Sequence, residues 1–158
     1  MIVYQKSIKT PVGRLYLTNS GNKLSGAYWN NPNKPPTNSN TSEEVHQLFS
    51  KTEKELSDYF LKKRKVFTIP LELEGTVFQK QVWAELLNIA YGEVLSYSDV
   101  CKKIGRPNAV RALGTANSKN PVSIIVPCHR VIRSDGQLSG YAGGVDTKKL
   151  LLDLESLI

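Results

Sequence analysis

The order of apolar and polar residues in the first part of the chain is typical of short β-strands. Apolar and polar side chains alternate loosely over residues 2–8, 13–19 and 23–29, and the turn-forming sequences TPVG and NSGN separate these runs. Residues 30–42 are rich in Asn, Pro, Ser and Thr and have almost nothing to bury. The pattern therefore predicts three strands followed by a loop.

A helical pattern follows this loop. Thr41 and Glu44 have the spacing of a capping box, in which each side chain bonds the other residue's backbone N–H at a helix start. The apolar side chains after them predict one face of an amphipathic helix: Val45, Leu48, Phe49, Thr52, Leu56, Tyr59 and Phe60. Residues 66–73 are expected to form another strand. We therefore predict an α/β N-terminal domain, residues 1–74, built from a small sheet and a helix.

From residue 75 onward the pattern becomes mostly helical. Thr76 and Gln79 form a second capping-box pattern. The apolar side chains that follow predict one helix face: Phe78, Val82, Leu86 and Ile89. Residues 96–104 and 107–118 predict two short helices joined by a tight turn, the second with a proline in its first turn. This pattern predicts a winged-helix-like C-terminal domain, residues 75–158, that contains a helix-turn-helix.

Residues 121–132, with the sequence PVSIIVPCHRVI, combine an apolar run with a cysteine and a histidine. The run 122–126 is expected to be a buried strand, and Pro127 should end it because proline cannot donate a ladder hydrogen bond. Cys128 would then lie at a strand end, where a side chain can face a pocket. A glycine-rich stretch and a final helix follow, and the predicted apolar face of that helix consists of Leu150, Leu151, Leu154 and Leu157.

The composition limits the class of protein. Of the 158 residues, 40% are hydrophobic and 22% are charged, as in soluble globular proteins. No apolar run approaches the roughly 20 residues that span a bilayer, and the N-terminus lacks the pattern of a secretory signal. Two cysteines without a framework spacing favour a reducing compartment. A cytoplasmic location without a membrane partner is therefore expected.

Basic side chains are concentrated in one part of the chain. The formal net charge is +7, and residues 101–134 contain seven basic residues and no acidic one: Lys102, Lys103, Arg106, Arg111, Lys119, Arg130 and Arg133. A solvated basic face is the ordinary interpretation, and a surface that faces nucleic acid phosphates is the alternative. In the second helix of the pair, Arg111 shares a face with Gly114 and Thr115. Small residues there either let a nucleic acid strand approach or permit helix packing.

Cys128 is one of two cysteines in the chain, and the adjacent His129 is one of two histidines. A free thiol is only a few per cent ionised at pH 7, and the thiolate is the nucleophile. His129 can take the thiol proton if the backbone is irregular or a water bridges the two groups, because adjacent strand residues face opposite ways. Glu155 on the final helix can orient the imidazole. The dipeptide alone favours a buried structural cysteine over a nucleophile.

The second half of the chain resembles the O6-alkylguanine-DNA alkyltransferases, which repair alkylated guanine. The motifs that carry the resemblance are GTVFQKQVWAELLNIAYGEVLSY, RALGTANSKNP, IIVPCHRVI, and GYAGG followed by a lysine and then LLDLE. They lie between residues 75 and 155, about half of the chain. The N-terminal residues match only as the variable α/β domain of that family.

The resemblance implies a role for each matching residue. Cys128 matches the alkyl acceptor. His129 (acting through a water), Glu155 and Asn120 match the groups that activate or support this acceptor. Tyr97 matches the tyrosine that crowds the target phosphate. Arg111 matches the arginine that fills the base stack when the target base is flipped out of the duplex.

Five further residues belong to the implied DNA and base contacts. Thr115 shares the small face of Arg111, and Lys119 stands where the family often has glycine, so both are expected to contact DNA. The carbonyls of the acceptor cysteine and of Val131 match the groups that hold the guanine amino group. Tyr141 belongs to the pocket wall, and Ala142 stands where some members have serine, at a position that acts through its backbone N–H.

The function implied by the resemblance is single-turnover DNA repair. The protein would bind duplex DNA through the minor groove as a monomer, and would flip out O6-alkylguanine or O4-alkylthymine. The alkyl group would move irreversibly to Cys128 with no cofactor. Some relatives in this family bind zinc in the N-terminal domain through Cys and His. No cysteine precedes Cys101 in this chain, so no metal site is expected. A non-enzymatic alkylated-DNA-binding or regulatory helix-turn-helix protein is the alternative, although alkyltransferase-like proteins carry tryptophan in place of the cysteine. A cysteine hydrolase would not account for Tyr97 and Arg111.

Overall fold

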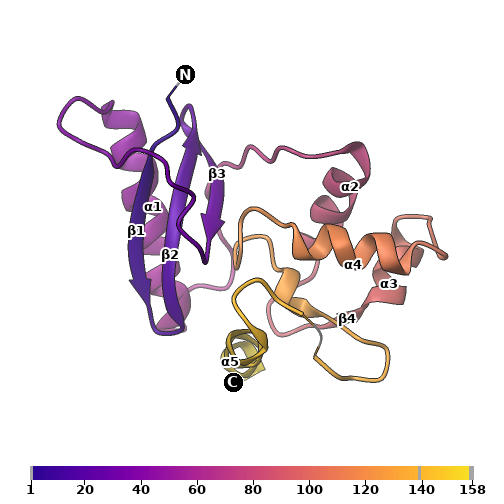
Figure 1. Ribbon diagram of the computed structural model, residues 1–158. Helices are drawn as coiled ribbons and strands as arrows, with labels where there is room; N and C mark the ends of the chain where they lie inside the picture. The colour runs from indigo at the N-terminus through magenta and orange to yellow at the C-terminus, as the bar shows by residue number, and fades with distance from the viewer. Residues whose placement is uncertain (1, 139, 157–158) are drawn as a thin grey trace. The chain divides into compact units, whose positions relative to one another are not determined.

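The computed structural model describes residues 2–138 and 140–156, which belong to two compact units, residues 1–73 and 74–158. The N-terminal unit contains β1 (Gln5–Thr10), β2 (Gly13–Ser20), β3 (Lys23–Tyr28) and α1 (Glu43–Phe60). The C-terminal unit contains α2 (Val77–Leu86), β4 (Leu95–Ser96), α3 (Tyr97–Lys103), α4 (Val110–Ser118), η1 (Cys128–Arg130), β5 (Val131–Ile132) and α5 (Val145–Ser156). Figure 1 colours the chain from indigo to yellow in this order. No helix within the described ranges is long and apolar enough to cross a membrane.

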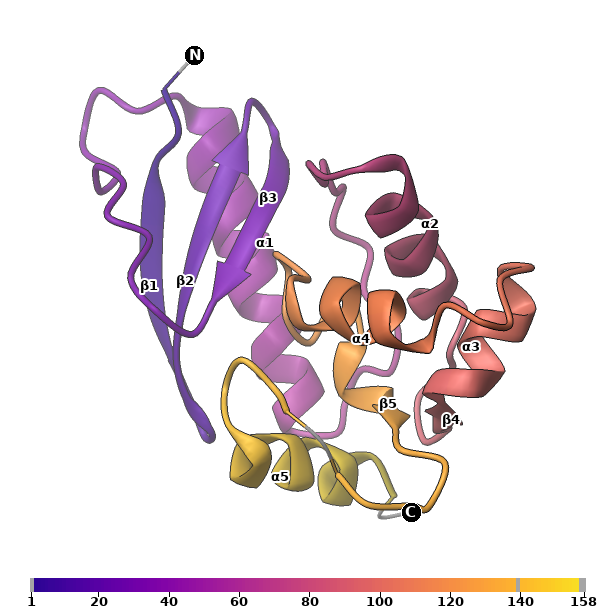
Figure 2. The same ribbon diagram turned by 45° about the vertical axis from the view of Figure 1, so that its right-hand side comes forward.

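The N-terminal unit is a three-stranded antiparallel sheet with one helix along a face. The strand order is β1-β2-β3, and both views show α1 running along the same face of the sheet (Figures 1 and 2). Alternate residues of β2, Leu15 and Leu17, are fully buried, and α1 buries Phe49 and Leu56. The predicted strands and the amphipathic helix are therefore confirmed, because period-two and helical apolar patterns meet in one core.

The start of α1 differs from the prediction. Ser42 is the N-cap, and its hydroxyl accepts a hydrogen bond from the Val45 N–H at 3.3 Å. The Thr41 hydroxyl instead accepts from the Asn38 N–H at 2.9 Å. The predicted capping box of Thr41 and Glu44 is therefore wrong by one residue. The loop before the helix uses the threonine, and the next hydroxyl residue caps the helix.

Residues 66–73 were expected to form a strand, and the structure shows an extended segment with a single bridge between Leu24 and Leu71. Two backbone hydrogen bonds make this bridge: the Leu24 N–H donates to the Pro70 carbonyl at 2.8 Å, and the Glu72 N–H donates to the Leu24 carbonyl at 2.9 Å. Pro70 has no N–H to extend the ladder. The segment therefore lies beside β3 without becoming a full strand.

In the C-terminal unit, α2, α3 and α4 pack together, and the Trp83 indole N–H ties α2 to α4 by donating to the Ala116 carbonyl at 2.9 Å. The predicted capping box at the start of α2 is present, as is a second one at the start of α3. Helix α4 begins at Val110, so the prediction that Pro107 lies in its first turn is wrong. The intervening residues form a turn closed by the Ala109 N–H and the Arg106 carbonyl at 3.1 Å.

The structure differs from two predictions based on apolar patterns in this unit. Residues 122–126 form a buried turn and not the predicted strand. On α5, Leu151 is fully buried whereas Leu150 is 52% exposed, and the predicted position Leu157 lies outside the described residues. An apolar run without a period does not distinguish a strand from a buried turn.

Candidate active site

Cys128 is the first residue of η1 and is 4% exposed. The turn that precedes it is held by the Asn120 side chain, whose Oδ1 accepts from the Val122 N–H at 3.0 Å and whose Nδ2 donates to the Val126 carbonyl at 2.8 Å. This amide takes over the hydrogen bonds that a neighbouring strand would make. Within the turn, Ile124 has φ +72°, a strained conformation for a β-branched residue. The thiol therefore lies at the end of a rigid, strained turn.

The next residue, His129, points to the last helix. Its Nε2 lies 2.7 Å from Oε2 of Glu155 on α5, and both side chains are buried. A carboxylate only accepts hydrogen bonds, so Nε2 carries the proton and Nδ1 is an acceptor. Nδ1 is buried and has no hydrogen-bond partner among the described residues. The irregular backbone of η1 thus brings the predicted base and its carboxylate together and leaves one basic nitrogen available.

Arg130 completes this buried cluster, although sequence analysis assigned it no role. Its Nε and Nη2 lie 2.7 and 3.0 Å from the two oxygens of Glu155, and its Nη1 donates to the Ile89 carbonyl at 2.6 Å. Its guanidinium also lies 5.9 Å from the centre of the Tyr91 ring. A fork of this kind fixes a carboxylate in one orientation. Arg130 therefore sets the position of Glu155, which in turn sets the ring of His129.

Burial shifts the protonation of both reacting groups toward their neutral forms. It raises the pKa of Cys128 to about 11, against the opposing effects of a hydrogen bond from Asn120 and the charge of Lys148. Burial lowers the pKa of His129, although Glu155 acts in the opposite direction. At pH 7 the resting pair is therefore a thiol beside a neutral imidazole, and the thiol must lose its proton before it can attack.

Two buried side chains that sequence analysis missed hold the carbonyls implied to bind the base. Lys148 is fully buried, and its Nζ donates to the Val131 carbonyl at 2.7 Å. Asn117 on α4 is also buried, and its Nδ2 donates to the Cys128 carbonyl at 3.3 Å. The one available signal was the position of both residues inside the motifs that carry the family resemblance. From its residue type alone, a lysine is expected to be exposed.

The predicted DNA-contact residues lie on a different surface from this cluster. Arg111 and Thr115 on α4 and Lys119 at its C-cap are exposed, and Tyr97, the first residue of α3, is half-buried. A Cβ at Gly114 would meet no atom within 4 Å, so no packing contact within the described residues requires this glycine. Helix α4 therefore presents Arg111 to solvent on one side and, through Asn117, contacts the backbone of the acceptor on the other.

The remaining predicted pocket residues lie in the loop between β5 and α5. Tyr141 is half-buried and Ala142 is exposed. The buried side chains near the thiol include Asn120 and His129, and Ala142 is not buried with them. No group of three His, Cys, Asp or Glu side chains within the described ranges is placed to hold a metal ion. The arrangement provides a nucleophile, a base and an orienting carboxylate.

Comparison with known proteins gives matches over nearly the whole chain. Residues 77–157 match the DNA-binding domain of 6-O-methylguanine DNA methyltransferase, and residues 3–73 match the ribonuclease-like domain of the same family. A methylated-DNA–protein-cysteine methyltransferase of Mycobacterium leprae is 41% identical over 154 residues, covering 98% of this chain and 93% of the relative. One from Methanosarcina acetivorans is 49% identical over 112 residues, 71% of this chain and 72% of the relative.

Solved structures give the same result. The structure of Mycobacterium tuberculosis OGT in complex with DNA has a TM-score of 0.86 and 39% identity, and the match covers 97% of this chain and 92% of that one. The Mycobacterium tuberculosis O6-methylguanine methyltransferase has a TM-score of 0.83 and 39% identity, with 98% and 93% covered. The chain belongs to the 6-O-methylguanine DNA methyltransferase family.

Proposed function

We propose that this protein repairs DNA by moving the alkyl group of O6-alkylguanine, and of O4-alkylthymine, irreversibly to Cys128. The observation that carries the proposal is a buried thiol next to a histidine whose ring is fixed by a buried carboxylate at 2.7 Å, in a chain of the methyltransferase family. A structural cysteine would need no base beside it. The thiol–imidazole–carboxylate arrangement is that of an activated nucleophile.

The chemistry follows from the protonation states of the cluster. The thiol proton moves to Nδ1 of His129, and a water bridges the two groups if they are not in direct contact. Glu155 stabilises the imidazolium that forms. The sulfur attacks the alkyl carbon, the S–C bond forms, the C–O6 bond breaks, and its electron pair stays on the guanine. The guanine regains a proton from the imidazolium. The thioether that remains has no leaving group that water can displace under these conditions, so each molecule acts once and needs no cofactor.

The base must leave the duplex before this reaction, because O6 cannot reach a buried thiol from inside the stack. We propose that α3 and α4 act as a helix-turn-helix of a winged-helix-like domain, with α4 in the minor groove. The open surface at Gly114 supports close approach of the DNA. Arg111 then fills the gap in the stack, Tyr97 crowds the target phosphate, and Thr115 and Lys119 contact the backbone without reading sequence.

The flipped base is held by backbone groups of the same unit. The carbonyls of Cys128 and Val131 accept from its amino group. In the structure the Cys128 carbonyl accepts from Asn117 Nδ2 and from the Val131 N–H, and the Val131 carbonyl accepts from Lys148 Nζ, so both oxygens are fixed in place. Tyr141 and the Ala142 N–H complete the pocket.

We further propose that residues 1–74 form a supporting domain and that residues 75–158 form the domain that binds DNA and accepts the alkyl group. We also propose that the protein works as a cytoplasmic monomer.

The test is incubation of the protein with a duplex that contains one O6-methylguanine, followed by intact mass measurement. The expected result is a permanent gain of one methyl group per protein, located on Cys128 by peptide mapping. A non-enzymatic DNA-binding or regulatory protein would bind the duplex and gain no mass, and a cysteine hydrolase would release the group and turn over. Either outcome, or a methyl group on Cys101, would overturn the proposal.

A further inference from the structure

A lysine is the least expected of the side chains around the acceptor. Lys148, on α5, is fully buried, and lysines are almost never fully buried unless a specific interaction holds them. Its Nζ lies 2.7 Å from the Val131 carbonyl oxygen, one of the two carbonyls assigned above to the base pocket. The ammonium group therefore belongs to the interior of the site and not to the basic surface that faces DNA.

The charges buried around the acceptor do not cancel while Cys128 is a thiol. The buried ionisable side chains in the described part of the C-terminal unit are the two cysteines, His129, Arg130, Lys148 and Glu155, and half-buried Tyr91 lies against Arg130. Arg130 and Glu155 form a close pair and carry opposite charges. With His129, the thiols and Tyr91 neutral, Lys148 gives the group a formal charge of +1. Ionisation of Cys128 places a negative charge among these groups: their formal charge stays at +1 when His129 takes the proton and becomes zero when the proton leaves for solvent. In both cases the positive charge of Lys148 favours the thiolate in a low-dielectric interior.

We propose that Lys148 is a positioning residue of the alkyl transfer: it fixes the Val131 carbonyl for the base and provides the positive charge that makes the Cys128 thiolate accessible. The proposal rests on the proposed function, since the thiolate is the species that attacks. It assigns a different task to each buried cation. Arg130 orients Glu155 and, through it, His129, whereas Lys148 acts on the sulfur electrostatically and on the base through a carbonyl.

The direction of the pKa shifts agrees with this geometry. The charge of Lys148 lowers the pKa of Cys128 against the larger effect of burial. Reciprocally, burial lowers the pKa of Lys148, and the charge of Cys128 raises it. Two groups that each favour the charged form of the other titrate as a pair. Loss of either one should therefore change the titration of its partner.

The test measures the reactivity of the thiol without DNA or a base. In a Cys101→Ser background, iodoacetamide labels Cys128 alone, and its rate is followed against pH by mass spectrometry. Lys148→Met keeps the length and volume of the side chain and removes its charge. We expect the pH profile of labelling to move upward by about one unit, which lowers the rate at pH 8 about tenfold. Lys148→Arg, which keeps the charge, should restore most of the rate.

The matched control is the neighbouring residue. Lys149 is exposed and pairs with Asp153 at 2.8 Å, so Lys149→Met should leave the labelling profile unchanged. A merely structural role for Lys148 would lower the melting temperature without moving the pH profile of the folded protein. An unmoved profile in folded Lys148→Met, or an equal shift in Lys149→Met, would overturn the proposal.

A second measurement needs no substitution at Lys148 and decides the question if Lys148→Met does not fold. In protein with isotope-labelled lysine, Nζ of Lys148 is titrated by NMR before and after methylation of Cys128 by iodomethane. Methylation removes the thiolate, so Lys148 should lose its proton at lower pH afterwards. An unchanged titration would contradict the proposal. Failure of methyl transfer from DNA, with these two results intact, would instead contradict the proposed function alone.

Discussion

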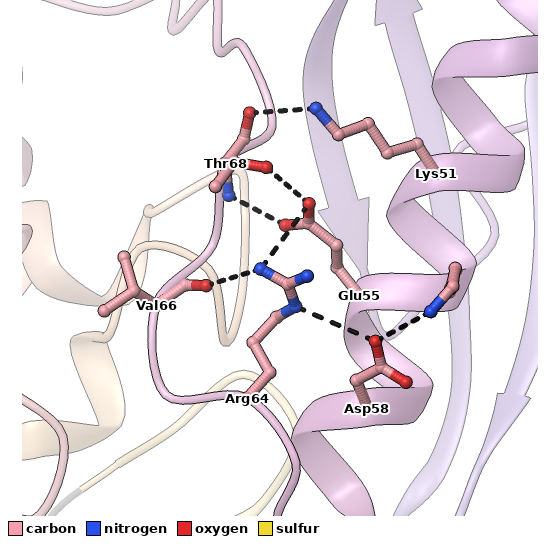
Figure 3. Close-up of polar contacts among 7 residues, drawn as sticks. Lys51, Glu55, Asp58, Arg64, Val66 and Thr68 are labelled. Atoms are coloured by element: carbon pink, nitrogen blue, oxygen red, sulfur yellow. Dashed lines mark hydrogen bonds and ion pairs between the residues drawn. The ribbon is translucent and has the colours of Figure 1, made fainter.

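Each half of the molecule buries a glutamate on a helix and pairs it with an arginine, and the two clusters do different work. In the N-terminal unit, Glu55 of α1 accepts from the Thr68 N–H at 2.7 Å, and Arg64 lies 3.7 Å from the carboxylate while donating to the Val66 carbonyl at 3.0 Å (Figure 3). In the C-terminal unit, Glu155 holds Arg130 and His129. Both clusters fix a segment of chain against a helix.

The difference lies in what the second cluster leaves available. In Figure 3 the dashed contacts of the first cluster run to Arg64, Val66 and Thr68 in the segment after α1. These contacts hold that segment against the helix. In the second cluster, Nδ1 of His129 has no hydrogen-bond partner among the described residues, and the preceding residue in the chain is Cys128, whose thiol is buried. A buried ion pair alone is thus a structural device. A base with one open nitrogen beside a nucleophile makes it a candidate site.

Removal of the nucleophile should abolish the difference in function between the two clusters. Cys128→Ser should abolish alkyl transfer and leave binding to duplex DNA largely intact, because a hydroxyl is a far poorer nucleophile with the same base. Intact mass after incubation with O6-methylguanine DNA measures transfer, and a gel-shift assay measures binding. Cys101→Ser is the control and should transfer at nearly the normal rate. Transfer by the Cys128→Ser protein would show that the acceptor lies elsewhere.

The matched pair Glu155→Gln and Glu55→Gln tests whether the two clusters differ in function. Glu155→Gln breaks a buried ion pair, so the free energy of unfolding should fall by about 3–5 kcal/mol, and loss of the orienting carboxylate should slow methyl transfer about 10²-fold. Glu55→Gln should lower the free energy of unfolding by about 1–3 kcal/mol and leave the transfer rate of folded protein unchanged.

Denaturant unfolding and single-turnover transfer at low temperature separate these effects. Equal loss of transfer in both variants would mean that the reaction responds to overall stability and not to the carboxylate beside His129. If Glu155→Gln does not fold, His129→Gln keeps a side-chain amide near Glu155 and tests the loss of the base alone.

A substitution on the exposed face of α4 separates base flipping from alkyl transfer, although both occur in the C-terminal unit. Arg111→Ala should slow repair of duplex DNA about 10- to 100-fold, since an unfilled gap in the stack adds part of the few kcal/mol that flipping costs. Reaction with the free base O6-benzylguanine, provided that the pocket admits a benzyl group, should keep its rate because no base has to leave a duplex. An equal loss on both substrates would show that Arg111 supports the pocket or the fold.

Sequence patterns correctly predicted the elements that are buried on one side only. The stripe of α1 and the alternation in β2 gave correct elements because burial on one side leaves a period in the sequence. The run 122–126 gave the wrong element because it is buried on all sides, and the hydrogen bonds that settle its shape come from Asn120. The burial of Lys148 leaves no signal in the pattern of apolar and polar residues, since it depends on where α5 meets Val131.

The smallest expected effect concerns the used protein, which should be less stable than the unreacted one. A methyl group on Cys128 enters a site where the sulfur is already buried and the turn before it is strained at Ile124. Overpacking of a dense site costs about 1–3 kcal/mol. The thioether also loses the S–H donor of the resting thiol, and this loss adds to the overpacking.

Thermal unfolding of DNA-free protein before and after complete methylation measures this effect. For a domain of this size, 1–3 kcal/mol corresponds to a fall of roughly 2–12 °C in the melting temperature, and a larger alkyl group should cause a larger fall. The N-terminal cluster around Glu55 provides the internal reference, because hydrogen exchange at Thr68 should change less than exchange around Asn120. A melting temperature that stays the same or rises would mean that the pocket holds preformed space for the alkyl group. In that case the strain at Ile124 would serve the geometry of attack and would not lower the stability of the methylated protein.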